Sequence, residues 1–254
     1  MGIQDKKLLY KTALNAAESA GKYLLKRFKD ADASITESYK HDVKSDVDVK
    51  TEEIIKSIII DQYPDHGFIC EESGNSGEDN KNKWIIDPLD GTVNFVKGIP
   101  HFCTSIAFKK GDEYIAGVVF DPVRNETFSA LKGIGSFLNG KPLTRSKVDS
   151  LEDAVVSGGF FKTKSLEMGG RIFEKISTHI KKVRFFGSAA LDLCYLAAGR
   201  FNAYIQYSVN EWDIAAALLI AELNNVKFNI NISDGHYNVV ASDPNIFDEL
   251  MNFI

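Results

Sequence analysis

The chain has 254 residues, which is long enough for one large domain or two closely packed lobes, and its 44% hydrophobic content is typical of a globular protein. Its 30 basic and 35 acidic residues give a formal net charge of −5, which argues against nucleic acid as a main partner of the surface. The polar N-terminus, the lack of about eighteen uninterrupted apolar residues and three scattered cysteines predict a cytoplasmic protein with reduced thiols and no membrane partner.

The first part of the chain predicts two helices. Small and apolar residues recur at helical spacing over residues 8–28, and this stripe indicates close packing on another helix. Residues 31–44 are polar and of mixed charge, so we interpret them as a loop that leads to a second helix with Asp48 as its N-cap. An apolar face over residues 54–59 continues that helix, and residues 63–67 end it.

The central stretch is residues 84–95, WIIDPLDGTVNF. The apolar run 84–86 predicts a buried strand that stops at Asp87-Pro88, because proline cannot donate to a strand ladder. We therefore expect Asp87 at the exposed carboxyl end of the strand, with Asp90 three residues later. Asp-Pro and Asp-Gly pairs also form plain turns, so the pattern is read together with the acidic residues elsewhere in the chain.

The rest of the chain predicts strands first and then alternating strands and helices. Lys110-Gly111-Asp112 and Asn139-Gly140 supply hairpin turns, which favour an antiparallel sheet in this region. Two α/β layers around an antiparallel centre follow from this pattern. A surface loop is predicted at 73–83, strands at 68–70, 102–108, 114–120, 127–130, 183–186 and 203–207, and helices at 189–198 and 214–223.

Competing catalytic motifs are absent from the sequence. It contains no G-x-x-x-x-G-K-[ST] loop, no H-E-x-x-H pair and no G-x-S-x-G elbow. Four acidic residues instead follow short apolar runs or begin an apolar helix, namely Glu71, Asp87, Asp90 and Asp213. Like charges held close together raise one another's pKa, and oxygen ligands select magnesium or manganese over zinc. These residues predict a site for a hard divalent cation.

Three motifs carry a resemblance to the inositol monophosphatase family of metal-dependent phosphatases. They are residues 71–73 (EES), residues 87–95 (DPLDGTVNF) and residues 211–216 (EWDIAA), and the likeness covers nearly the whole chain. The resemblance implies an α/β fold, the layered αβαβα sandwich of the inositol monophosphatase and fructose-1,6-bisphosphatase type. We expect a single unit, residues 1–254, with lobes at about 1–145 and 146–254, that forms a homodimer.

The resemblance also implies which atoms hold two or three Mg²⁺ ions, with Mn²⁺ as an alternative. Glu71, Asp87 and the Leu89 carbonyl would bind a first ion, and Asp87, Asp90 and Asp213 a second. Asp87 would bridge the two. Such ions lower the pKa of a water molecule, neutralise a phosphate and stabilise a leaving alkoxide.

The catalytic residues implied by the resemblance are Glu71, Thr92 and Asp48. Glu71 and Thr92 would orient the attacking water, and Asp48 would accept a hydrogen bond from Thr92. The backbone N–H groups of Gly91 and Thr92 would donate to the phosphate. Asp48 is the last residue of the segment 42–48, which corresponds to a family segment that also begins with Asp. The family has Thr at the position of Ser45. The family also has a lysine in the mobile loop before this segment, and Lys40 would be its counterpart here.

The substrate end of the site departs from the family. Ser188 stands where the family has threonine, and Gln206 stands where it has glutamate. Because glutamine replaces a charged acceptor by an amide that also donates, we expect a changed preference for the inositol ring of the substrate. The alternative is that Gln206 is only a polar residue at a strand edge. The residues expected to contact substrate are Asp90, Gly91, Thr92, Gly187, Ser188, Ala189, Gln206 and Asp213. The implied activity is a lithium-sensitive, Mg²⁺-dependent phosphomonoesterase acting on myo-inositol 1-phosphate or a related small sugar phosphate.

Several alternatives stay open at this point. Within the family they are 3′(2′),5′-bisphosphate nucleotidase, fructose-1,6-bisphosphatase and histidinol-phosphatase. A regulatory binding protein with the same fold is the alternative that is not an enzyme.

Overall fold

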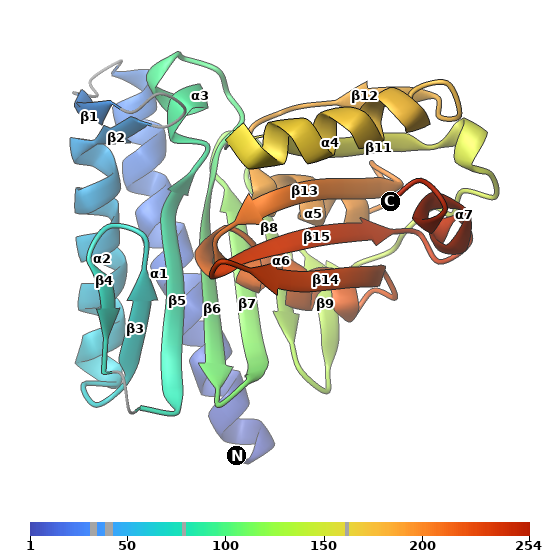
Figure 1. Ribbon diagram of the computed structural model, residues 1–254. Coiled ribbons are helices and arrows are strands. Elements are labelled where there is room, and N and C mark those ends of the chain that lie inside the picture. Colours follow the sequence, from blue (N-terminus) through green and yellow to red (C-terminus); the bar gives the residue numbers. More distant parts are fainter. Residues whose placement is uncertain (31–34, 39–42, 78–79, 161–162) are drawn as a thin grey trace.

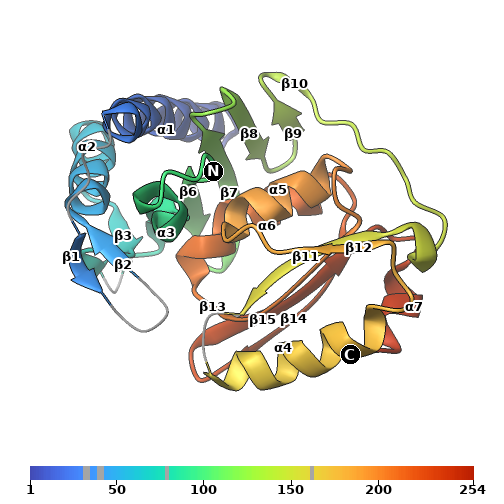
Figure 2. The same cartoon turned by 90° about the horizontal axis from the view of Figure 1, so that it is seen from above.

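The computed structural model describes residues 1–30, 35–38, 43–77, 80–160 and 163–254, and these form five layers in the order helix, sheet, helix, sheet, helix (Figure 1, Figure 2). The expected αβαβα sandwich is therefore confirmed. Lys40 and Asp42 lie outside the described residues. None of the helices in the described part of the chain combines the length and the apolar character needed to cross a lipid bilayer.

The larger sheet has eight strands and is mostly antiparallel, with β3 and β5 as its one parallel pair among the pairings described. Its apolar strand residues alternate between two faces, and each face packs on a layer of helices. In sheet order the strands are β10 (Lys141–Pro142), β9 (Gly135–Leu138), β8 (Glu126–Leu131), β7 (Glu113–Asp121), β6 (Cys103–Lys110), β5 (Asn82–Asp90), β3 (Gly67–Cys70) and β4 (Gly74–Ser76).

The smaller sheet has five strands and is mixed, with β11 parallel to both of its neighbours. In sheet order the strands are β12 (Lys182–Arg184), β11 (Val155–Phe160), β13 (Ala203–Val209), β15 (His236–Ser242) and β14 (Lys227–Ser233). A further two-stranded hairpin pairs β1 (Ile35–Ser38) with β2 (Val43–Ser45). The division into two lobes near residue 145 stays a prediction. One apolar core contains residues of the larger sheet, of the smaller sheet and of the helices between them.

The helices fill three layers (Figure 2). α1 (Ile3–Lys29) and α2 (Asp46–Gln62) cover the outer face of the larger sheet. α5 (Ala189–Ala197) and α6 (Glu211–Glu222) lie between the sheets and are apolar nearly all round, because both of their sides are buried. α4 (Thr163–Ile176) and α7 (Phe247–Met251) cover the smaller sheet. The remaining helical turns are α3 (Thr92–Val96) and the 3-10 turn η1 (Leu151–Asp153).

Two local expectations near the central stretch are wrong. β5 does not stop at Asp87 but continues through Pro88 to Asp90, with a shift of register between Asp87 and Asp90 that accommodates the proline. Asp87 is consequently only 2% exposed rather than at an exposed strand end. The predicted surface loop at 73–83 contains the edge strand β4.

The expected cap of α2 is also wrong. Ser45 is the N-cap residue, and its hydroxyl accepts a hydrogen bond from the Val47 N–H. Asp48 is the third helical residue, and its Oδ2 accepts from the Ser45 backbone N–H at 3.0 Å. The pair forms a capping box that fixes the Asp48 carboxylate, and its other oxygen, Oδ1, is directed at Thr92 at the start of α3.

Candidate active site

The end of β5 places the central acidic residues. Asp87 Oδ1 accepts a hydrogen bond from the Leu89 N–H at 3.0 Å, which stabilises the bulged backbone. Gly91 follows with φ +96°, and a Cβ atom built on it would lie 3.0 Å from the His101 carbonyl oxygen. Only glycine fits there without strain, and α3 then begins at Thr92.

The acidic residues predicted from the sequence lie near one another. The carboxyl groups of Glu71 and Asp87 interact with each other, and each affects the pKa of the other. Burial raises the pKa of Asp87 well above its usual value, and the charges of Glu71, Asp90 and Asp213 raise it further. Burial, followed by the charges of Asp213 and Asp48, does the same to the pKa of Glu71. This mutual effect indicates a site with surplus negative charge.

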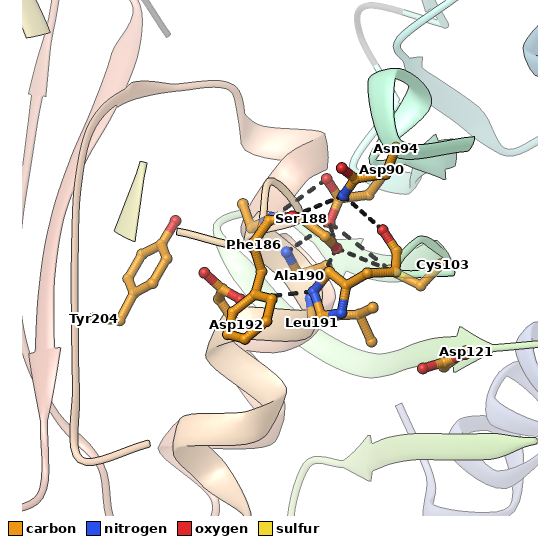
Figure 3. A network of polar contacts seen from close by, with 12 residues as sticks. Asp90, Asn94, Cys103, Asp121, Phe186, Ser188, Ala190, Leu191, Asp192 and Tyr204 are labelled. Atoms are coloured by element: carbon orange, nitrogen blue, oxygen red, sulfur yellow. Dashed lines mark hydrogen bonds and ion pairs between the residues drawn. The ribbon is translucent and has the colours of Figure 1, made fainter. Parts of the chain in front are cut away.

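Asp90 and Asp213 each bind backbone amides in this structure. Asp90 Oδ2 accepts hydrogen bonds from Ser188 Oγ at 2.6 Å and from the Ala190 N–H at 2.8 Å, at the start of α5 (Figure 3). Asp213 Oδ2 accepts from the Asn210 N–H at 2.8 Å, in the capping box of α6. Two helices between the sheets therefore bring their N-terminal turns to the end of β5.

The donor set fits a hard divalent cation in its chemistry. Burial raises the pKa values of the Glu71, Asp87 and Asp90 carboxyl groups, and carboxylate oxygens are the ligands that hard divalent cations prefer. In the described part of the chain, no three Asp, Glu, His or Cys side chains are already arranged closely enough to hold a metal ion together.

Thr92 and Asp48 form the contact that the resemblance implies. Thr92 Oγ1 lies 2.8 Å from Asp48 Oδ1 and 3.0 Å from the Leu89 carbonyl oxygen, so both acceptors are within reach of its single O–H donor, and the carboxylate is the nearer. Asp48 is 1% exposed; burial raises its pKa, and the hydrogen bonds from Ser45 and Thr92 partly offset this. The lone pairs of the Thr92 hydroxyl stay available to accept a hydrogen bond from water.

The predicted substrate segment lies beside the central stretch (Figure 3). Ser188 is the N-cap of α5, and Ala189 N lies 3.3 Å from Asp90 Oδ1. Gly187 has φ +78°, and a Cβ atom on it would be 3.4 Å from the side chain of Asn94. Asn94 Nδ2 donates to the Phe186 carbonyl at 2.7 Å, which ties this segment to α3.

Gln206 is placed in the interior of the smaller sheet. It lies on β13, the middle strand, so the alternative of a polar residue at a strand edge is wrong. Gln206 is 2% exposed, its Oε1 accepts from the Tyr204 hydroxyl at 2.6 Å, and its Nε2 has no hydrogen-bond partner among the residues that the structure describes. An unpartnered buried amide indicates a position where a ligand group or water completes the bonding.

Sequence reasoning missed several polar groups around Asp90. Asn94 lies within the central motif, so the sequence could have indicated a role for it; its Nδ2 donates to the carbonyls of His101 and Phe186. Cys103 Sγ lies 3.8 Å from Asp90 Oδ2, and no sequence spacing indicated this contact. His101 Nε2 lies 3.8 Å from Asp192 Oδ1; both residues are buried, burial lowers the pKa of His101, and burial raises that of Asp192.

Comparisons with known proteins agree with this geometry. The profile of the inositol monophosphatase family matches residues 5–223. The chain is 39% identical over 252 residues to Nus factor SuhB of Pasteurella multocida (strain Pm70), covering 95% of this chain and 94% of that protein. The structure of extragenic suppressor protein suhB from Bartonella henselae superposes with a TM-score of 0.90 and 30% identity, covering 97% and 98% of the two chains. Inositol monophosphatase from Anabaena (Nostoc) sp. PCC 7120 superposes with a TM-score of 0.83 and 28% identity, covering 97% and 95%.

Proposed function

The chain belongs to the inositol monophosphatase family, and from this premise we propose that it is a Mg²⁺-dependent phosphomonoesterase that acts on myo-inositol 1-phosphate or a related small sugar phosphate. One observation carries the proposal. The buried Asp87 at the end of β5 lies among Glu71, Asp90 and Asp213, and the Thr92–Asp48 pair stands beside them. Surplus carboxylates together with a water-orienting hydroxyl are what metal-assisted hydrolysis requires.

Five groups would supply the oxygen ligands in this proposal. Glu71, Asp87 and the Leu89 carbonyl would hold one cation, and Asp87, Asp90 and Asp213 a second. When bound, such cations neutralise the phosphate and make a nearby water more acidic. The pKa of Asp87 is raised by burial and by the charges of Glu71, Asp90 and Asp213, and a bound cation would balance that negative charge.

The chain's own residues supply orientation. The Thr92 hydroxyl donates its proton toward Asp48, which leaves its lone pairs to accept from the attacking water and so to aim a water lone pair at phosphorus. Asp48 keeps this hydroxyl in one rotamer, because the Ser45 cap fixes the carboxylate. We further propose that the N–H groups of Gly91 and Thr92 donate to the phosphate oxygens.

The substrate's ring would lie toward α5 and β13. Ser188 and Asp90 are within hydrogen-bond distance of each other, and either can exchange that bond for a sugar hydroxyl. Gln206 offers one unpartnered donor, Nε2, where a glutamate would offer an acceptor. This difference supports testing bisphosphorylated substrates beside monophosphates.

A panel of phosphate esters tests the activity. Phosphate release would be measured from myo-inositol 1-phosphate, fructose 1,6-bisphosphate, 3′-phosphoadenosine 5′-phosphate and histidinol phosphate, with Mg²⁺, with EDTA, and with added Li⁺. We expect the highest kcat/KM with the inositol ester, no release in EDTA, and inhibition by Li⁺. Release from none of the four esters with Mg²⁺ or Mn²⁺ would refute the phosphatase proposal, and a higher kcat/KM with another ester would assign that activity instead.

A second candidate function follows from the similar protein named Nus factor SuhB. Identity of 39% over nearly the full length of both proteins supports a shared partner surface as well as a shared fold. Expression of this chain in bacteria that lack their own SuhB tests the role that the name denotes. Rescue of growth by the Asp87→Asn variant would separate that role from phosphate release, and failure of wild-type and variant alike would count against it.

A further inference from the structure

A buried carboxylate on α2 holds the turn that follows Glu71. Glu52 is 3% exposed. Its Oε2 accepts a hydrogen bond from the Glu72 backbone N–H at 2.9 Å, and its Oε1 accepts one from the Ser73 N–H at 3.2 Å. Two successive amides directed at one carboxylate form a small anion-binding concavity. Both oxygens of Glu52 are therefore used to fix the two residues directly after Glu71.

The other side of Glu71 is fixed to β5. The Glu71 N–H donates to the Ile86 carbonyl at 3.2 Å, one residue before Asp87. Glu71 thus lies between one anchor on the sheet and a second anchor on α2. The position of its carboxylate relative to that of Asp87 depends on both anchors, since the backbone at residues 71–73 forms a turn at the end of β3.

Lys56 compensates the buried charge of Glu52. Its Nζ lies 4.0 Å from Glu52 Oε1, donates to Ser73 Oγ at 2.9 Å, and sits 5.3 Å from the centre of the Phe68 ring. The Lys56 side chain is 26% exposed, whereas that of Glu52 is 4% exposed. A carboxylate with this degree of burial needs such partners, because an unpaired buried charge is strongly unfavourable. The contacts form a unit that joins α2 to the turn.

We propose that Glu52 is a positioning residue that sets the divalent-cation affinity of the site by holding Glu71 opposite Asp87. This inference rests on the proposed function, in which Glu71 and Asp87 hold a cation. Glu52 itself contacts neither the substrate nor the reacting atoms. Partners that orient metal ligands typically change affinity 10–100-fold when they are removed.

Two substitutions separate positioning from the effect of charge alone. Glu52→Gln keeps the size of the side chain but leaves a single acceptor oxygen and turns an NH₂ group toward an amide N–H. Glu52→Asp keeps the negative charge but is one methylene shorter, so its carboxylate does not reach both amides. Glu53→Gln is the matched control, because Glu53 is the next residue on α2, 60% exposed, and pairs with Lys50 at the surface.

Mn²⁺ binding to the substrate-free protein is the primary readout, measured by isothermal titration calorimetry. We expect both Glu52 variants to bind Mn²⁺ about tenfold more weakly than the wild type, and Glu53→Gln to bind within about twofold of it. Thermal unfolding in EDTA checks that each variant is folded at the temperature of the titration. Hydrogen exchange of the Glu72 and Ser73 amides should be faster in Glu52→Asp, and kcat at saturating Mg²⁺ should change by less than about threefold.

The outcomes separate this inference from the function on which it rests. Wild-type protein that binds no Mn²⁺ would refute the cation site itself and both proposals with it. Wild-type binding together with unchanged affinity in folded Glu52→Asp would refute only the positioning role, because the charge would then suffice. If Glu52→Gln does not fold, Glu52→Asp alone decides the question.

Discussion

Changing Asp87 to asparagine should move activity and stability in opposite directions. The side chain keeps its shape, and the asparagine Oδ1 still accepts the Leu89 N–H that the aspartate accepts at 3.0 Å. Asp87 is buried, and the charges of Glu71, Asp90 and Asp213 raise its pKa further. Two like charges about 4 Å apart at an effective dielectric constant of about 20 repel by about 4 kcal/mol. We expect the metal-free variant to be more stable than the wild type by about 1–2 kcal/mol. Phosphate release should fall at least about 100-fold, because both proposed cations lose a ligand.

Two assays check these expectations on the same protein preparation. Urea denaturation in EDTA gives the free energy of unfolding, and phosphate release at several Mg²⁺ concentrations gives kcat and the Mg²⁺ requirement. Retention of more than about a tenth of the wild-type activity, a loss below roughly 1.4 kcal/mol, would contradict the bridging role of Asp87. A metal-free variant less stable than the wild type would contradict the claim that surplus charge strains this site.

Three further predictions concern other parts of the molecule. Thr92→Ala and Asp48→Asn should each lower kcat more than they raise KM, and a double-mutant cycle should show strong non-additivity; additive losses would separate the two residues. Gln206→Glu should shift the ratio of kcat/KM values about tenfold toward inositol monophosphate over a bisphosphorylated substrate, and an unchanged ratio would remove Gln206 from the substrate site. Burial lowers the pKa of His66, whose Nδ1 accepts from Trp84 Nε1 at 3.1 Å, so at this position the unfolded chain binds more protons than the folded chain as the pH falls through 6.5. The difference in unfolding free energy between the wild type and His66→Gln should therefore shift in favour of His66→Gln as the pH falls from 7.5 to 5.5, as measured by urea denaturation of both proteins at both pH values, and an unchanged difference would contradict this contribution of His66.

The framework of the site could be predicted because local signals agree with the fold. The apolar run before Asp87 lies in β5, and Asp213 begins an apolar helix, α6, as expected. Periodicity indicates such elements directly, since it reflects which face is buried. The layered architecture could be expected from the order of the elements together with the resemblance of their motifs.

Other features depend on contacts that no local pattern encodes. Pro88 is tolerated inside β5 because the register shifts there, and a bulge of this kind leaves no clear signal in the sequence. Glu52 looks like an ordinary helical glutamate until the turn at residues 71–73 is placed against it. Gln206 could not be recognised as interior, because strand order in a mixed sheet depends on long-range pairing.

The bond between Asp90 and the start of α5 has a consequence for how the protein is synthesised. Asp90 and Ser188 are separated by 98 positions in the chain. A ribosome that adds roughly 5–20 residues per second completes that interval in about 5–20 s, so Asp90 leaves the ribosome well before the helix that will bind it. Throughout that time Asp90 lacks the hydroxyl and amide partners at the start of α5 that it binds in the folded protein. The order of translation thus means that the site cannot be completed until α5 and then Asp213 on α6 have been made.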